Sequence, residues 1–180
     1  VADRQLPWAH QVPRSEARLI PQERERSSLN DQPTVEIAND QTTCAIDEPV
    51  IRKAVLDILA GEGVTSGQIS VAIVDDATIR EVNRRHLQHD YATDVISFVL
   101  DREGGCLDGE VIVSADTARA VAADLAWPAE DELLMYVVHG TLHLVGYDDR
   151  TDSDREEMRS RERHYLAGFG LVPPWEDFDQ

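Results

Sequence analysis

The sequence is poor in cysteine and has no long apolar run. Cys44 and Cys106 lie far apart and form no CxxC pair, which is unlike a disulfide-rich secreted domain. Two free thiols in a cytoplasmic protein are the simplest interpretation, and a single disulfide is the alternative. No apolar stretch approaches the roughly 20 residues that span a bilayer, so we expect no membrane partner.

Basic residues are also scarce, because 17 Lys and Arg stand against 35 Asp and Glu and give a formal net charge of −18. A polyanion repels RNA at long range, and nonspecific phosphate binding needs Lys and Arg. Composition alone therefore argues against a nucleic-acid partner. Binding of RNA would have to depend on a local basic surface and a metal ion. Otherwise the charge reflects a salty habitat or an acidic exterior away from any site.

The pattern along the chain predicts one domain with two appendages. Residues 1–32 mix Arg, Glu, Gln, Ser and Pro without periodicity, and we interpret them as a flexible extension, with a partner-binding arm as the alternative. Residues 33–172 are long enough to form one core. Residues 173–180 are predicted to be an acidic tail.

Hydrophobic spacing predicts the elements of this domain. Strands are expected at 35–38, 69–75, 93–98 and 109–114. Helices are expected at 47–60, from Asp76 or Thr78 to 83, at 115–125, at 133–144 and after 151. Gly104-Gly105 predicts a turn that makes a hairpin of the last two strands. The helix at 133–144 is apolar nearly all round, so it should lie at the centre of the domain.

The run His139-Gly-Thr-Leu-His143-Leu-Val-Gly146-Tyr147-Asp148-Asp149 carries the chemistry. Residues at i and i+4 share one face of a helix, so both imidazoles can point at one spot. Gly146 can end the helix in the left-handed conformation, after which a carboxylate can return to the site. The pattern predicts two histidines and one carboxylate around a metal ion, with an open position; the alternative is that both histidines are satisfied core residues. The fold class is thus predicted to be α+β: a small mixed β-sheet with about five helices, and a metal site on a central buried helix.

This run resembles the signature of the YbeY-type endoribonucleases, bacterial RNA-maturation factors, which reads H-G-x-L-H-L-x-G-Y-D-H. The sequence matches every fixed position except the last. Thr93-Asp94-Val95-Ile96-Ser97-Phe98 is similar to the family's T-D-V-L-S-F, and Gly109 to Ser114 is similar to its G-D-I-x-I-S. The resemblance covers roughly residues 33–170. It implies one zinc ion per chain, held by His139, His143 and the residue at position 149.

Asp149 stands where the family has its third histidine. A carboxylate cancels one unit of the metal's charge, so we expect activity at a higher pH than in a three-histidine relative. Carboxylate oxygen is also a harder ligand, which moves selectivity somewhat towards manganese or iron. Asp148 is the rival ligand, or a partner that orients a histidine.

A second difference concerns the segment before Thr93. The family has an arginine where this chain has Leu87, and a lysine where it has His89. An arginine there would stabilise charge on a phosphoryl group. The candidate substrate-binding side chains are nearby: Arg84, Arg85, His86, His89, Asp94 and Ser97. The alternative for the first four is that they form a solvated, charged helix face without a role in binding. The alternative for the last two is a plain core strand, in which Thr93 and Asp94 fix the preceding turn.

The resemblance therefore implies a zinc-dependent, single-strand-specific endoribonuclease that acts on rRNA precursors in ribosome maturation. The first alternative is a non-catalytic, metal-stabilised ribosome assembly factor, favoured by Leu87 and the negative charge. A non-haem iron oxygenase shares the ligand set but ranks lower, because both histidines lie on one helix. A metalloprotease ranks last, since Gly140 takes the place of the glutamate of H-E-x-x-H. We interpret Gly140 instead as a structural residue that lets the helix approach another backbone closely.

Overall fold

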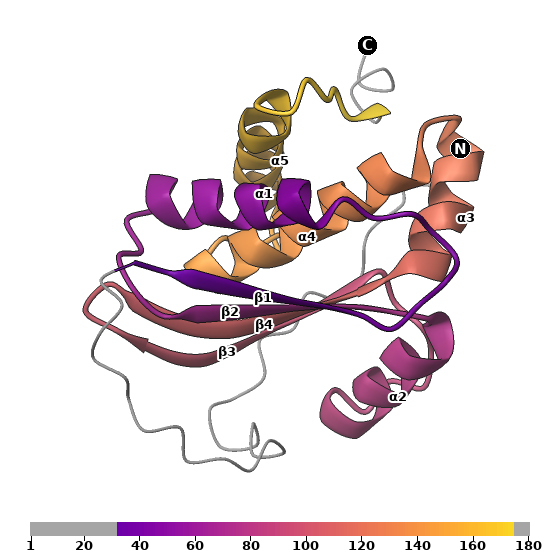
Figure 1. Cartoon of the computed structure of the whole chain (residues 1–180), viewed down its shortest axis with the longest axis horizontal. Helices are drawn as coiled ribbons and strands as arrows, with labels where there is room; N and C mark the ends of the chain where they lie inside the picture. The colour runs from indigo at the N-terminus through magenta and orange to yellow at the C-terminus, as the bar shows by residue number, and fades with distance from the viewer. Residues whose placement is uncertain (1–31, 175–180) are drawn as a thin grey trace.

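The described part of the chain forms a four-stranded mixed sheet with helices on both faces (Figure 1). The computed structural model describes residues 32–174, so the predicted extension and most of the predicted tail lie outside the described residues. The strands are β1 (Thr34–Asn39), β2 (Gln68–Val74), β3 (Val95–Glu103) and β4 (Cys106–Ser114). The helices are α1 (Glu48–Gly61), α2 (Asp76–His86), α3 (Ala115–Leu125), α4 (Ala129–Val145) and α5 (Asp152–Ala167). The α+β class with a mixed sheet and five helices is confirmed for this part of the chain.

The sheet has the order β1-β2-β4-β3. β1, β2 and β4 run parallel, and β3 is antiparallel to β4. The turn at Gly104-Gly105 makes this last connection, and both glycines adopt positive φ angles, 56° and 99°, which residues with a Cβ rarely take. The predicted hairpin is therefore confirmed.

Helix caps set the element boundaries much as the sequence indicates. Asp47 Oδ1 accepts a hydrogen bond from the Val50 amide at 3.1 Å, and Thr151 and Asp154 form a reciprocal capping box at α5. α2 begins at Asp76, which is one of the two predicted starts. Its capping side chain is Asp75, which accepts a hydrogen bond from the Thr78 amide at 2.8 Å.

Two hydrophobic cores hold the layers together. The larger lies between one face of the sheet and α1, α4 and α5. The smaller lies on the other face, where Ile96, Phe98 and Ile112 pack against Ile79 of α2. Every residue of α4 from Glu132 to Val145 is buried, which confirms the predicted central helix.

Gly140 lets α4 lie close to the sheet. A Cβ placed on Gly140 would lie 2.7 Å from Val111 Cγ1, 2.7 Å from Val95 Cγ2 and 2.9 Å from Ser97 Oγ. Close approach was expected from the sequence, but the partners are side chains of β3 and β4, not another backbone. Ser97 Oγ also donates a hydrogen bond to the Gly140 carbonyl at 2.9 Å.

Neither cysteine forms a disulfide, and both are half-buried free thiols. Among residues 32–174, no helix combines the length and the hydropathy that crossing a membrane requires.

Replacing Gly140 by alanine tests this close approach. At an exposed helix position the exchange gains about 1 kcal/mol of helix propensity. Here the added methyl group overpacks the interface with the sheet, so we expect a net loss of about 1–3 kcal/mol in the free energy of unfolding. Chemical denaturation measures it, and a variant as stable as the wild type would contradict the packing described.

Candidate metal centre

His139 and His143 point their rings at one another from consecutive turns of α4. Their Nε2 atoms are 2.9 Å apart, and the rings meet edge to face at 82°. Two nitrogens bound to one tetrahedral zinc, each at 2.0–2.1 Å, would be about 3.3 Å apart. A small rotation of either ring therefore brings both nitrogens to bonding distance of one ion.

The other nitrogen of each ring is fixed by an acceptor. His143 Nδ1 donates to the backbone carbonyl of Tyr147 at 2.9 Å. His139 Nδ1 is 2.6 Å from Glu162 Oε1 on α5. With hydrogens on both Nδ1 atoms, the Nε2 lone pairs are the ones that face each other. In metal sites, an acceptor on the far nitrogen of a histidine orients the ring in this way.

The turn after α4 brings a carboxylate to the same place. Gly146 ends the helix with φ 112°, and its amide donates to the carbonyls of Leu142 and His143. One ligand atom from each of His139, His143 and Asp149 lies within 4.8 Å of the others. A donor set of two imidazole nitrogens and one carboxylate oxygen fits a divalent metal ion.

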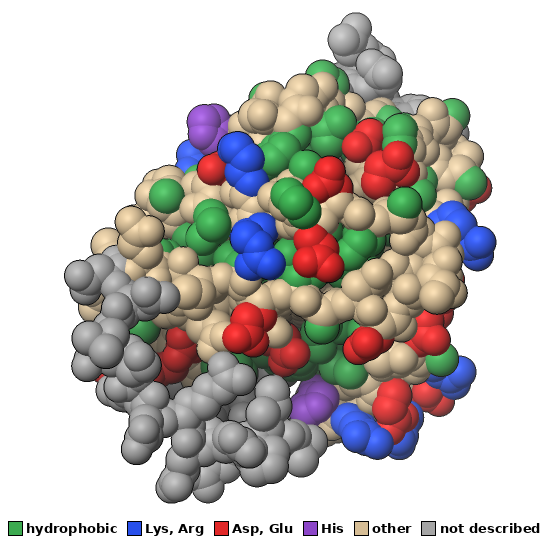
Figure 2. Space-filling view, in the orientation of Figure 1, with side chains coloured by type: hydrophobic (Ala, Val, Ile, Leu, Met, Phe, Trp, Pro, Cys, Tyr) green, Lys and Arg blue, Asp and Glu red, His purple; other side chains and the backbone are tan. Residues whose placement is uncertain are grey.

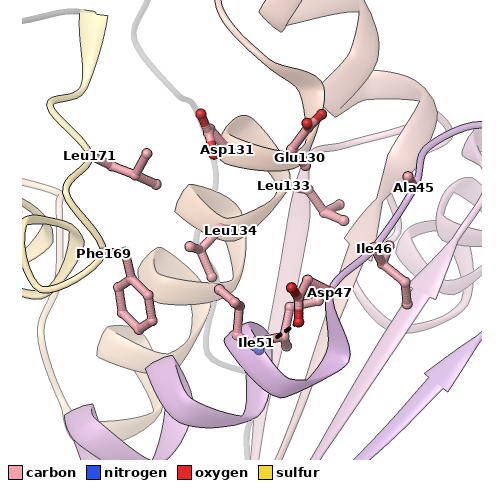
Figure 3. Close-up of a pocket in the computed structure, with 11 residues that line it drawn as sticks. Ala45, Ile46, Asp47, Ile51, Glu130, Asp131, Leu133, Leu134, Phe169 and Leu171 are labelled. Atoms are coloured by element: carbon pink, nitrogen blue, oxygen red, sulfur yellow. Dashed lines mark hydrogen bonds between the residues drawn. The ribbon is translucent and has the colours of Figure 1, made fainter.

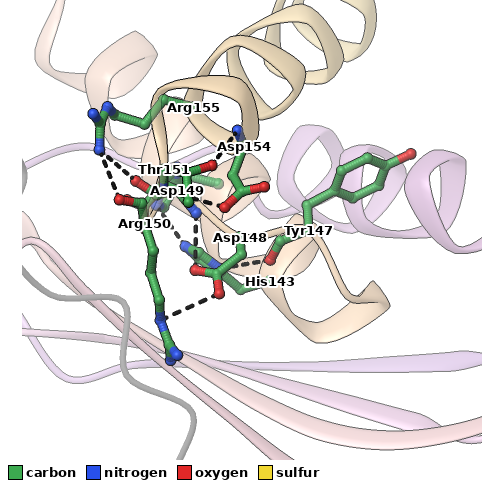
Figure 4. A network of polar contacts seen from close by, with 9 residues as sticks. His143, Tyr147, Asp148, Asp149, Arg150, Thr151, Asp154 and Arg155 are labelled. Atoms are coloured by element: carbon green, nitrogen blue, oxygen red, sulfur yellow. Dashed lines mark hydrogen bonds and ion pairs between the residues drawn. The ribbon is translucent and has the colours of Figure 1, made fainter.

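Asp148, the rival, is engaged elsewhere in this turn (Figure 4). Its Oδ1 accepts from the Asp149 amide at 2.9 Å, and its Oδ2 lies 3.2 Å from Arg150 Nε. Arg155 Nη1 donates to the Asp149 carbonyl at 2.9 Å. Asp148 and Arg155 thus hold the backbone around Asp149, whose carboxylate is the one grouped with the histidines.

Burial and neighbouring charges move the pKa values of the two histidines in opposite directions. Burial, followed by the charge of His139, lowers the pKa of His143 to about 3. Burial also acts to lower the pKa of His139, but the hydrogen bond and charge of Glu162, with the charges of Asp94 and Asp149, raise it overall. Burial raises the pKa of Asp149 as well. A metal ion must displace the His139 proton, so metal affinity should fall as the pH falls through the raised pKa of His139.

Glu162 was not predicted from the sequence, although a signal exists. It is buried on α5, with only 5% of its surface exposed, on the stripe formed by Met158, Tyr165 and Leu166. A carboxylate in an otherwise apolar stripe needs a buried partner. That partner, His139, is 23 residues away in sequence, so local spacing does not identify it.

A polar cluster ties α1, the turn and α5 together. Glu62, just after α1, accepts hydrogen bonds from the hydroxyl groups of Tyr147 at 3.0 Å and Tyr165 at 2.7 Å, and from Arg161. The Arg161 guanidinium also lies over both tyrosine rings. Tyr147 supplies the carbonyl that orients His143, and Arg161 precedes Glu162. The cluster therefore anchors both residues that orient the histidines.

The structure brings two of the six predicted substrate-binding residues to α4. Ser97 contacts Gly140, and the charge of Asp94 acts on His139. Asp94 is buried and accepts from the Val95 amide at 2.7 Å, so it also fixes the start of β3. Its burial raises its pKa to about 6, against the opposing charge of His139 and hydrogen bonds from the backbone and Thr93.

The other four lie on or just after α2, which covers the opposite face of the sheet (Figure 1). Arg84 and Arg85 are exposed and both pair with Glu81. His86 meets the ring of Phe98 edge to face, and His89 stacks on Tyr91. Leu87 packs against the smaller core. Their contact with a substrate remains a prediction.

A separate apolar hollow lies between α1, the start of α4 and the segment after α5 (Figure 3). Leu134, Ile51 and Phe169 line it, and Asp47, Glu130 and Asp131 also face it. It lies at the end of α4 opposite to His143, and it has no part in the metal centre.

Known proteins resemble this chain over the described region. The sequence model of a family described as Endoribonuclease YbeY matches residues 36–170. The Endoribonuclease YbeY of Rhodopirellula baltica is 46% identical over 126 residues, covering 69% of this chain and 65% of that protein. The one from Chloroherpeton thalassium is 40% identical over 124 residues, covering 69% and 87%. A solution structure of a Thermotoga maritima protein aligns with TM-score 0.54 at 24% identity, covering 81% of this chain and 91% of that one, and supports the fold alone.

Glu162→Gln tests the orientation of His139. Glutamine keeps the shape of the side chain but removes the negative charge that faces His139 Nδ1–H. We therefore expect zinc affinity to fall roughly 10- to 100-fold in a chelator competition. Glu156→Gln, an exposed carboxylate on the same helix, is the matched control and should leave the affinity unchanged. Equal affinities for the two variants would contradict a positioning role for Glu162.

Proposed function

Because the chain belongs to the YbeY endoribonuclease family, we propose that it is a metal-dependent endoribonuclease. Its substrate would be single-stranded RNA in ribosomal RNA precursors, cleaved during ribosome maturation in the cytoplasm, with a ribosomal subunit as partner. The observation that carries the proposal is the convergence of His139, His143 and Asp149 on one spot. We assign all three as metal ligands and as catalytic residues.

Zinc is the proposed ion, one per chain, with manganese or iron as alternatives because one ligand is a carboxylate. When bound, such an ion polarises a phosphoryl oxygen and lowers the pKa of water. The chain supplies the geometry for this. Glu162 and the Tyr147 carbonyl hold the two rings, while Asp148 and Arg155 hold the backbone that carries Asp149.

A non-catalytic assembly factor is the second candidate. The arginines of α2 that could meet a phosphate are already paired with Glu81, and Leu87 lies against the smaller core. In that case the metal would stabilise the turn between α4 and α5, and the protein would bind ribosomal particles without cleaving their RNA.

RNA cleavage separates the two candidates. Wild-type protein loaded with zinc should cleave a single-stranded oligoribonucleotide and leave a duplex of the same length intact. His143→Ala should lower the rate of RNA cleavage at least about 100-fold. The reason is that it removes a metal ligand, and losing a ligand costs more than losing a residue that only orients one. His164→Ala, which changes an exposed histidine of α5, should not alter the rate.

Gel analysis of cleavage products gives the readout, alongside sedimentation with ribosomal subunits. Binding of subunits with no cleavage by the zinc- or manganese-loaded wild type would support the assembly factor. Cleavage that persists in His143→Ala would contradict the proposed site.

A further inference from the structure

An enzyme of net charge −18 that acts on RNA needs a cation beside its catalytic group. Acidic side chains are spread over the face of the molecule shown in Figure 2, with fewer basic ones among them. Most basic side chains near the metal centre are engaged. Arg150 pairs with Asp148, Arg155 with Asp152 and two carbonyl groups, and Arg161 with Glu62.

A β-bulge brings another arginine, Arg102, to the side of the sheet that carries α4. Before the bulge, even-numbered residues of β3 such as Ile96 face α2. The pairing register shifts between Val99 and Asp101, and Arg102 then lies opposite Leu107 of β4. Leu107 is buried in the larger core, on the α4 side. Paired residues of antiparallel strands share a face, so the bulge turns Arg102 towards α4.

Arg102 lies directly against the end of the metal-binding helix. A Cβ placed on Gly146 would lie 3.3 Å from Arg102 Nη1. Gly146 stands three residues after His143 and three before Asp149. In Figure 1, α4 ends over the end of the sheet where β3 turns into β4.

The guanidinium of Arg102 is available to a ligand. The side chain is exposed, and it forms no ion pair with any residue between 32 and 174. Its neighbours Asp101 and Glu103 lie on the other face of the strand by alternation. Arg102 is thus a cation without a carboxylate partner in the described structure, at the rim of a site that would receive an anionic substrate.

We propose that Arg102 binds a phosphate group of the RNA strand beside the metal centre and so positions the strand for cleavage. The guanidinium presents a planar fork of donors that matches two phosphate oxygens. This inference rests on the proposed endoribonuclease function. The competing explanation is that Arg102 only stabilises the C-terminal end of α4 through the helix dipole.

Arg102→Gln should weaken binding of a single-stranded oligoribonucleotide roughly five- to tenfold at low salt, as expected for one lost charge-assisted contact. The slope of log affinity against log salt should shrink by about 0.7, the value for one phosphate contact on a single strand. In cleavage assays KM should rise more than kcat falls. Arg102→Lys should retain part of the affinity, because it keeps the charge and loses the fork.

The measurements use the zinc-loaded full chain, with fluorescence anisotropy for binding and thermal unfolding for stability. Arg119→Gln is the matched control, since it removes one charge from an exposed position on α3. One outcome is that Arg102→Gln lowers the melting temperature while its RNA affinity and salt slope equal those of Arg119→Gln. That result would mean that Arg102 only stabilises the end of α4, and the inference would be wrong. A wild type that neither binds nor cleaves RNA would instead reject the proposed function, and this inference with it.

Discussion

The candidate metal centre depends on the hydrogen bonds to the Nδ1 atoms of His139 and His143. Glu162 and the Tyr147 carbonyl hold these nitrogens, and only with hydrogens on both Nδ1 atoms do the two Nε2 lone pairs point at a shared position. The two acceptors belong to different segments, α5 and the turn after α4. The geometry of the site therefore requires α5 to dock against α4 and the turn at Gly146 to keep its left-handed conformation.

Two further contacts keep these segments in place. The cluster of Glu62, Arg161, Tyr147 and Tyr165 joins the end of α1 to the turn and to α5. Gly140 lets α4 settle onto β3 and β4 one residue after His139. The two histidines thus stand on the buried part of α4, from Glu132 to Val145, and the residues that orient them are held by a third element. This arrangement suits a site whose geometry must persist while a substrate enters and leaves.

Local signals in the sequence were enough to predict α4, its end at Gly146, the hairpin and a helix after residue 151. They were also enough to group His139, His143 and Asp149. Contacts between segments that are distant in the sequence could not be predicted from it. The partnership of Glu162 with His139 depends on how α5 docks. The placement of Arg84 and Arg85 across the sheet depends on strand order, and the direction of Arg102 depends on a bulge that breaks the alternation of β3.

The metal content of purified protein, measured by mass spectrometry for the wild type and for Asp149→Ala, tests whether His139, His143 and Asp149 hold an ion. We expect about one zinc ion per chain in the wild type, and a loss or marked weakening of zinc binding in the variant. Full metal content in Asp149→Ala would show that the third ligand is Asp148 or water. No metal in the wild type, even after incubation with zinc or manganese, would contradict the account, because His139 and His143 would then be core residues without a ligand role.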